Sequence, residues 1–196
     1  HRLDTRNLSH NASIYGAHLV GASTDGWLVD EPGYYRVQAA VTIGEELIVS
    51  DPLRIYVDRP ASSGEAALAQ DYFTEDVGRV LAFGGAPFLS AAQDTLGTLI
   101  DTCPNGAAAT HAAVALASSR MRTYKLLDVD ADGQMIVRSS AADLAGSYTA
   151  LGRLIDDETK AAATLGHIPY YALLDRLTDA LAEDEARDEA RTLQNS

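Results

Sequence analysis

The stretch that decides the fold class covers residues 31–57 and reads EPGYYRVQAAVTIGEELIVSDPLRIYV. Pro32 and Gly33 stand where a tight turn requires them. Apolar residues then recur at every second position, which is typical of a half-buried antiparallel strand: Tyr35, Val37, Ala39 and Val41. Gly44 and Pro52 interrupt the run, and residues 53–57 alternate again. The stretch therefore predicts a meander of short antiparallel strands, which we extend upstream to strands at residues 13–20 and 27–29.

Residues 31–39 and 50–57 together resemble the closing strands of an immunoglobulin-like (Ig-like) β-sandwich in bacterial multidomain proteins. The resemblance covers about residues 13–57, is structural, and implies no chemistry. Such a sandwich usually holds about seven strands in ~100 residues. This part of the chain supplies fewer, so for the β segment over residues 1–58 we expect one of two cases: the domain is incomplete, or its missing strands lie upstream of His1.

A linker is predicted at residues 59–64 by composition, and a helical domain at residues 65–196. Ser63, Thr74 and Ser140 are candidate helix N-caps, and Pro169 suits the start of the last helix. The last helix should bury a stripe made of Tyr170 or Tyr171 with Leu174, Leu177 and Leu181. Residues 124–137 break the helical rhythm around Asp132-Gly133 and predict a small hairpin.

The fold class predicted is therefore α+β, with a short antiparallel Ig-like β segment followed by a helical bundle or an array of helical hairpins. A tetratricopeptide-like array is one interpretation of the helices. Because no period near 34 residues is visible, an irregular bundle is the preferred one.

The charge balance limits the classes of partner. The chain of 196 residues has a formal net charge of −13 and a pI near 4.6. Nucleic acids and anionic membranes attract positive fields, so neither is expected as a partner. No run approaches the ~20 apolar residues of a membrane span. Cys103 is the single cysteine, which excludes an internal disulfide.

One motif points to a metal. Asp128, Asp130 and Asp132 alternate before Gly133, as at the opening of an EF-hand calcium loop. Ser139 occupies the twelfth position, where such a loop carries a bidentate glutamate. The three aspartates are thus candidate calcium ligands, with an acidic hairpin turn as the alternative. No other cofactor is expected.

No catalytic residues are predicted. The five histidines have no metal-ligand spacing, and the chain lacks the nucleophile-elbow, P-loop and dinucleotide-binding motifs. We therefore lean against an enzyme and expect a non-catalytic protein-interaction or scaffold module with a protein partner.

Two alternatives stay open. One is an accessory fragment of a larger secreted enzyme, a hydrolase whose catalytic part lies outside this chain. The other is a calcium-dependent module. The Ig-like resemblance and the first residue, which is not Met, favour a periplasmic or extracellular location, and the oligomeric state is left open.

Overall fold

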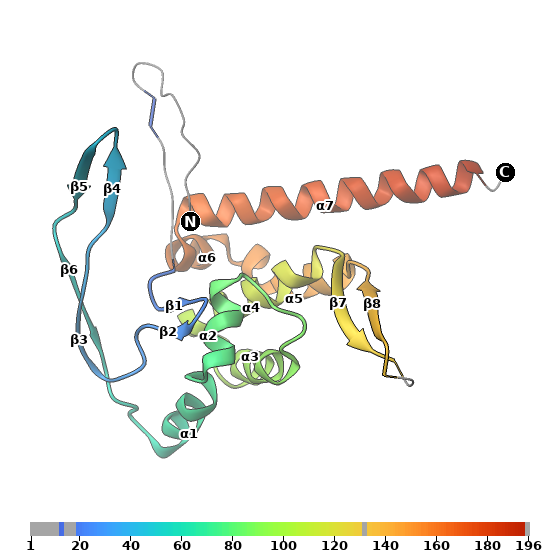
Figure 1. Ribbon diagram of the computed structural model, residues 1–196. Coiled ribbons are helices and arrows are strands. Elements are labelled where there is room, and N and C mark those ends of the chain that lie inside the picture. Colours follow the sequence, from blue (N-terminus) through green and yellow to red (C-terminus); the bar gives the residue numbers. More distant parts are fainter. Residues whose placement is uncertain (1–11, 14–18, 131–132, 195–196) are drawn as a thin grey trace.

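The computed structural model describes the backbone of residues 12–13, 19–130 and 133–194, and the side chains of these residues up to residue 185. Within them the chain forms helices and short antiparallel strand pairs, which confirms the α+β class (Figure 1). Each described strand pairs with a single other strand, so the sheets are all two-stranded. The strand expected at residues 13–20 lies largely outside the described residues.

The longest β structure is a two-stranded ribbon over residues 33–57, called the long ribbon below. β3 (Gly33–Val37) pairs with β6 (Leu53–Val57), and β4 (Ala40–Ile43) pairs with β5 (Glu46–Val49). Gly44, at a φ of 63°, forms the two-residue turn between β4 and β5 in a conformation that glycine adopts without strain. The meander predicted from the sequence is therefore one continuous hairpin.

A β-bulge bends the long ribbon halfway along. Two residues separate Val37 from Ala40 on one strand, whereas three separate Val49 from Leu53 on the other. The hydroxyl of Ser50 accepts a hydrogen bond from the Ala39 amide at 3.0 Å. Asp51-Pro52 supplies the extra length, and a proline without an N–H is tolerated at such a site.

The first strand pair belongs to the helices rather than to the long ribbon. β1 (Ala22–Ser23) and β2 (Gly26–Trp27) pack on α2 (Glu75–Ala82). Ala22 is buried and Trp27 joins the core cluster of the first helices. Residues 22–27, which were expected to belong to the β segment over residues 1–58, thus pack with the helices.

The helical body begins with α1 (Ser63–Tyr72), α2, α3 (Ser90–Thr102) and α4 (Ala107–Arg120). After the hairpin of β7 (Tyr124–Val129) and β8 (Met135–Ser140) come α5 (Leu144–Asp156), α6 (Glu158–Leu165) and α7 (His167–Gln194). Ser62 caps α1 by accepting from the Glu65 amide at 3.1 Å, one residue before the expected Ser63. Asp143, not Ser140, caps α5 through the Gly146 amide.

The alanine-rich α4 is the centre of the helical body. It gives Ala112, Ala115 and Leu116 to a first core shared with α2 and α3. It gives Ala113 and Ala117 to a second core shared with α5, α6 and α7. Small side chains on both sides let helices approach closely, so one helix can be buried between two layers.

Helix α7 leaves the body after its first turns (Figure 1). Tyr170, Leu173 and Leu177 are buried, whereas Leu181 is 41% exposed. The predicted stripe was therefore wrong at Leu181, since the later turns of α7 project away from the other helices (Figure 1). None of the described helices combines the length and the apolar character that a membrane crossing requires.

Candidate functional site

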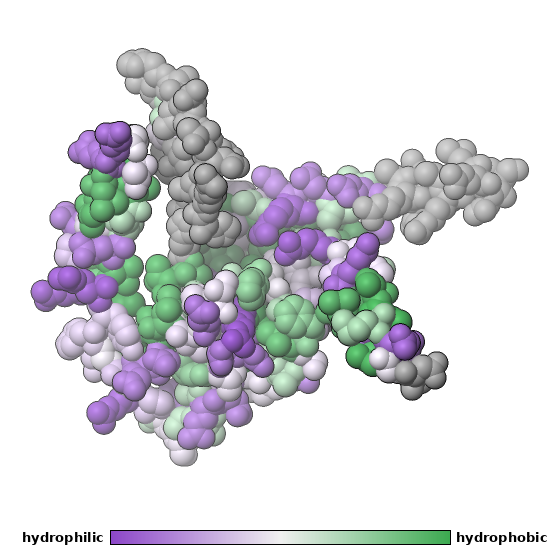
Figure 2. Space-filling view, viewed as in Figure 1, coloured by the Kyte–Doolittle hydropathy of each residue, from purple (hydrophilic) through white to green (hydrophobic). Residues whose placement is uncertain are grey.

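The long ribbon exposes large apolar side chains that a globular protein normally buries. Figure 2 shows apolar residues gathered over β4 and β5. Among the described residues, its strands pack on one another and no helix covers either face. The exposed members are Tyr34, Val41, Ile43, Leu47, Ile48, Val49, Leu53 and Tyr56.

The strand register places different kinds of side chain on the two faces of the β3–β6 pair. Residues directly opposite in an antiparallel pair lie on the same face. The apolar face consists of Tyr35, Val37, Leu53, Ile55 and Val57. The other face, called the Tyr/Arg face, consists of Tyr34, Arg36, Arg54 and Tyr56. On the apolar face Leu53 is 62% exposed and the other four residues are half-buried, whereas all four residues of the Tyr/Arg face are exposed.

The base of the long ribbon is held by a tyrosine. The hydroxyl of Tyr35 donates to the Glu31 carbonyl oxygen at 2.8 Å and accepts from the Glu31 amide at 3.2 Å. This side chain closes the turn through Pro32-Gly33 and fixes the direction in which β3 starts.

The β7–β8 hairpin carries a second exposed apolar patch, which is also visible in Figure 2. Leu127 lies opposite Val137 and Val129 opposite Met135, all on one face. Leu127 is 72% exposed and Met135 68%. The four residues form a compact surface that the described helices leave open.

The predicted calcium ligands fall in this hairpin, and the hairpin itself was predicted. Asp128 lies in β7 and pairs with Arg138 across the strands, with 2.6 Å between Oδ2 and Nε. Asp130 accepts the Gln134 amide at 2.8 Å through Oδ1, and its carbonyl accepts the Gly133 amide. Asp132 lies outside the described residues. Among the described residues, no group of three or more metal-ligating side chains converges, and with Asp132 outside them the calcium site stays a prediction.

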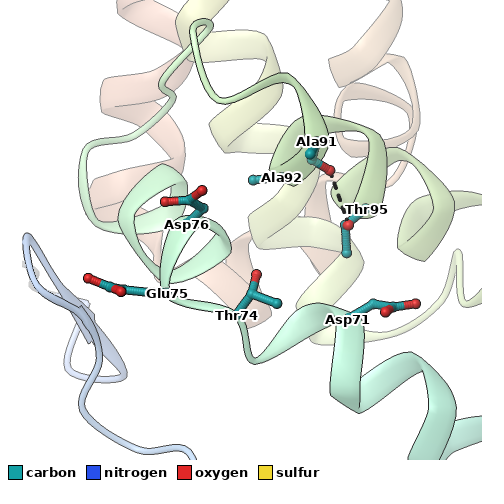
Figure 3. A pocket seen from close by; sticks show the side chains of 7 residues that line it. All are labelled: Asp71, Thr74, Glu75, Asp76, Ala91, Ala92 and Thr95. Carbon is teal, nitrogen blue, oxygen red and sulfur yellow. Dashed lines mark hydrogen bonds between the residues drawn. The ribbon is translucent and has the colours of Figure 1, made fainter.

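A surface cleft of about 390 Å³ opens between the end of α1, the start of α2 and the first turn of α3 (Figure 3). Asp71, Thr74, Glu75 and Asp76 line one wall, and Ala91, Ala92 and Thr95 the other. Arg79 pairs with Glu75 and, at 3.1 Å, with Asp76. The Thr95 hydroxyl donates to the Ala91 carbonyl of its own helix. No described hydrogen bond joins a threonine hydroxyl of the cleft to one of its carboxylates.

The remaining reactive side chains are dispersed. Cys103 is exposed at the end of α3. His111 lies in α4, where burial lowers its pKa below the usual 6.5. Burial in the first core raises the pKa of Tyr72 to about 12, so this phenol is a packing group at neutral pH.

No family model matches the chain, and no curated protein and no solved structure matches it in sequence or in fold. The site must therefore be interpreted from its own residues. The sequence predicted the strands of the long ribbon but not the exposure of both faces. The period-two pattern marks one face as more apolar, and no local signal tells whether that face is covered.

Proposed function

We propose that this protein is a non-catalytic interaction module that binds a protein partner through the long ribbon. The observation that carries the proposal is the exposure of apolar side chains on both faces of a ribbon that no described helix covers. Exposed apolar patches of this kind mark interaction surfaces on soluble proteins.

The backbone of the long ribbon supports the same proposal. A two-stranded hairpin alone in water is marginally stable, because it lacks a second layer over its apolar face. Each strand of this ribbon also has one edge without a strand neighbour among the described residues. Such edges accept an added strand, which supplies main-chain hydrogen bonds and covers apolar side chains together.

The Ig-like character of the ribbon is part of this proposal. Ig-like sandwiches contain a tyrosine at the start of a late strand whose hydroxyl bonds to the backbone a few residues upstream. Tyr35 makes that contact with Glu31, and the β3–β6 pair follows it. The apolar face of the ribbon corresponds in this interpretation to the inner face of a sandwich, which a partner β-sheet would cover.

The test is a pull-down from a lysate of the source organism with the tagged full chain. The variant Ile48→Asp/Leu53→Asp places two charges on the exposed ribbon. Leu181→Asp is the matched control, because Leu181 is an exposed apolar residue of α7. We expect a protein that the native chain and the control retain at equal levels and that the ribbon variant loses.

Far-UV circular dichroism establishes that the three proteins are folded. A partner retained equally by the ribbon variant would show that the ribbon is not the binding surface. A native chain that retains no protein above the level of an unrelated tagged protein would remove the interaction proposal itself.

A further inference from the structure

Two arginines face one another on the Tyr/Arg face. Arg36 and Arg54 are directly opposite in the β3–β6 register, and both are exposed. In the part of the chain that the structure describes, no carboxylate forms an ion pair with either of them. Like charges in directly opposite positions destabilise a strand pair. The arginine pair is thus a cost to the isolated ribbon that a bound anionic group would relieve.

The surroundings of this pair are aromatic. Among the described arginines, Arg79 and Arg138 form ion pairs with acids, whereas Arg36 and Arg54, like Arg122, form none. Arg36 and Arg54 lie beside Tyr34 and Tyr56, whose ring centroids are 4.6 Å apart. Tyrosine and arginine are the residues enriched where proteins bind one another.

The two faces of the long ribbon together indicate which kind of ligand would bind to it. Side chains of a strand added at an edge of the sheet alternate between the faces. On one face they meet Arg36 or Arg54, and on the other they meet the apolar row that includes Val37 and Ile55. Guanidinium groups select carboxylates through charge-assisted, often bidentate, hydrogen bonds.

Resting on the proposed function, we propose that the partner segment is an extended peptide that alternates acidic and apolar residues. Its backbone pairs with one strand edge, its acidic side chains bind the arginine of that strand (Arg36 on β3 or Arg54 on β6), and its apolar side chains extend the apolar row of the opposite face. A peptide is favoured over a phosphate or an acidic polysaccharide, because only a peptide satisfies both the strand edge and the apolar face.

Because the net charge of the chain is −13, a binding experiment can separate the effect of the overall charge from that of the arginine pair. The overall field of an acidic protein attracts cations, so charge alone predicts preference for a basic peptide. Only the local arginine pair predicts preference for an acidic one. A peptide series that differs only in charge therefore separates the two causes.

The probes are three fluorescein-labelled peptides of about ten residues, the length of a long strand. They alternate valine with glutamate, lysine or threonine, and binding to the full chain is measured by fluorescence anisotropy in about 0.15 M salt. We expect the glutamate peptide to bind about tenfold more tightly than the lysine peptide. The double variant Arg36→Gln/Arg54→Gln, which removes the arginine at either edge, should weaken binding of the glutamate peptide about fivefold.

The matched control is Arg122→Gln, an exposed arginine before β7, which should leave binding unchanged. The double reversal Arg36→Glu/Arg54→Glu should make the lysine peptide the tighter ligand.

If the threonine peptide binds as well as the glutamate peptide, the acidic preference is wrong and strand addition stands. If none of the three binds while the pull-down retains a partner through the ribbon, the partner is not a segment of this kind. Displacement of the glutamate peptide by millimolar inorganic phosphate would reassign the arginine pair to a simple anion site.

Discussion

The indole Nε1–H of Trp27 donates a hydrogen bond to the carbonyl oxygen of Tyr72 at 3.1 Å, across 45 positions of the sequence. The Trp27 ring also contacts the rings of Tyr72 and Phe73, with centroid distances of 5.0 and 4.8 Å. The contact joins β2 to the last turn of α1, on either side of the long ribbon in the sequence. Both ends of the ribbon segment are therefore tied to the helical body.

Replacing Trp27 tests this attachment. Trp27→Phe keeps an aromatic ring but removes the donor, so the free energy of unfolding should fall by about 1 kcal/mol. Trp27→Ala also loses the ring packing and should cost about 3 kcal/mol. Urea unfolding followed by far-UV circular dichroism measures both changes, since Trp27 is the only tryptophan and fluorescence is lost with it. Equal stability of all three proteins would mean that β2 is not anchored to α1.

Helix α2 lies directly on the backbone of β2. A Cβ added at Gly78 would stand 2.8 Å from the Gly26 carbonyl carbon and the Trp27 amide nitrogen, neither of which can rotate away. Gly78→Ala should therefore destabilise the protein by about 1–3 kcal/mol. Gly97→Ala is the matched control, because it is also a helical glycine but has open space around its Cβ position. That control should gain about 0.5–1 kcal/mol, and equal effects at both positions would contradict the close approach.

His111 gives the protein a pH dependence in a defined direction. Burial lowers its pKa in the folded state below 6.5, its usual value when exposed. The folded state then binds fewer protons than the unfolded state near and below that value. The neutral form of His111 therefore makes its full contribution to the free energy of unfolding above about pH 6.5. This contribution is lost as the pH decreases through the folded-state pKa. We expect urea midpoints of the native protein to fall in this window more steeply than those of His111→Gln, and parallel pH profiles would contradict the burial.

We expect the exposed apolar patch of the β7–β8 hairpin to contribute little to the free energy of unfolding. Leu127→Thr/Val137→Thr keeps β-forming residues while removing two exposed apolar side chains. The free energy of unfolding should change by less than about 0.5 kcal/mol, as is usual for surface positions. Binding of the dye ANS should decrease, because less apolar surface stays accessible. A loss of more than about 1.5 kcal/mol would show that the patch packs against the protein itself.

Local chemistry explains the elements that the sequence predicted well. Thr74 precedes α2 as expected, with Glu75 and Asp76 in the first turn of the helix. The turns at Gly44 and Gly133 both have positive φ, which their glycines made predictable. Caps and turns depend on residues within a few positions of one another, so a single sequence contains the information that specifies them.

The arrangement of these elements was decided by the tertiary structure. The pattern of α7 predicted Leu174 and Leu181 on its buried stripe. Leu174 does pack, partly buried, against the second core, but Leu173 is the more deeply buried residue and Leu181 is exposed. The arginine pair of the ribbon was equally invisible, because Arg36 and Arg54 meet only through a register that the bulge at Ser50 helps to set.

The sequence by itself therefore determined the α+β class, the start of α2, the small hairpin around Gly133 and the lack of recognisable catalytic motifs. Only the tertiary structure decided that residues 22–27 pack on α2, that α4 is buried between two cores, and that the long ribbon stands uncovered. The physical reason is the range of the interactions. Backbone conformation follows from neighbouring residues, whereas burial depends on contacts between segments tens of residues apart, which no local pattern specifies.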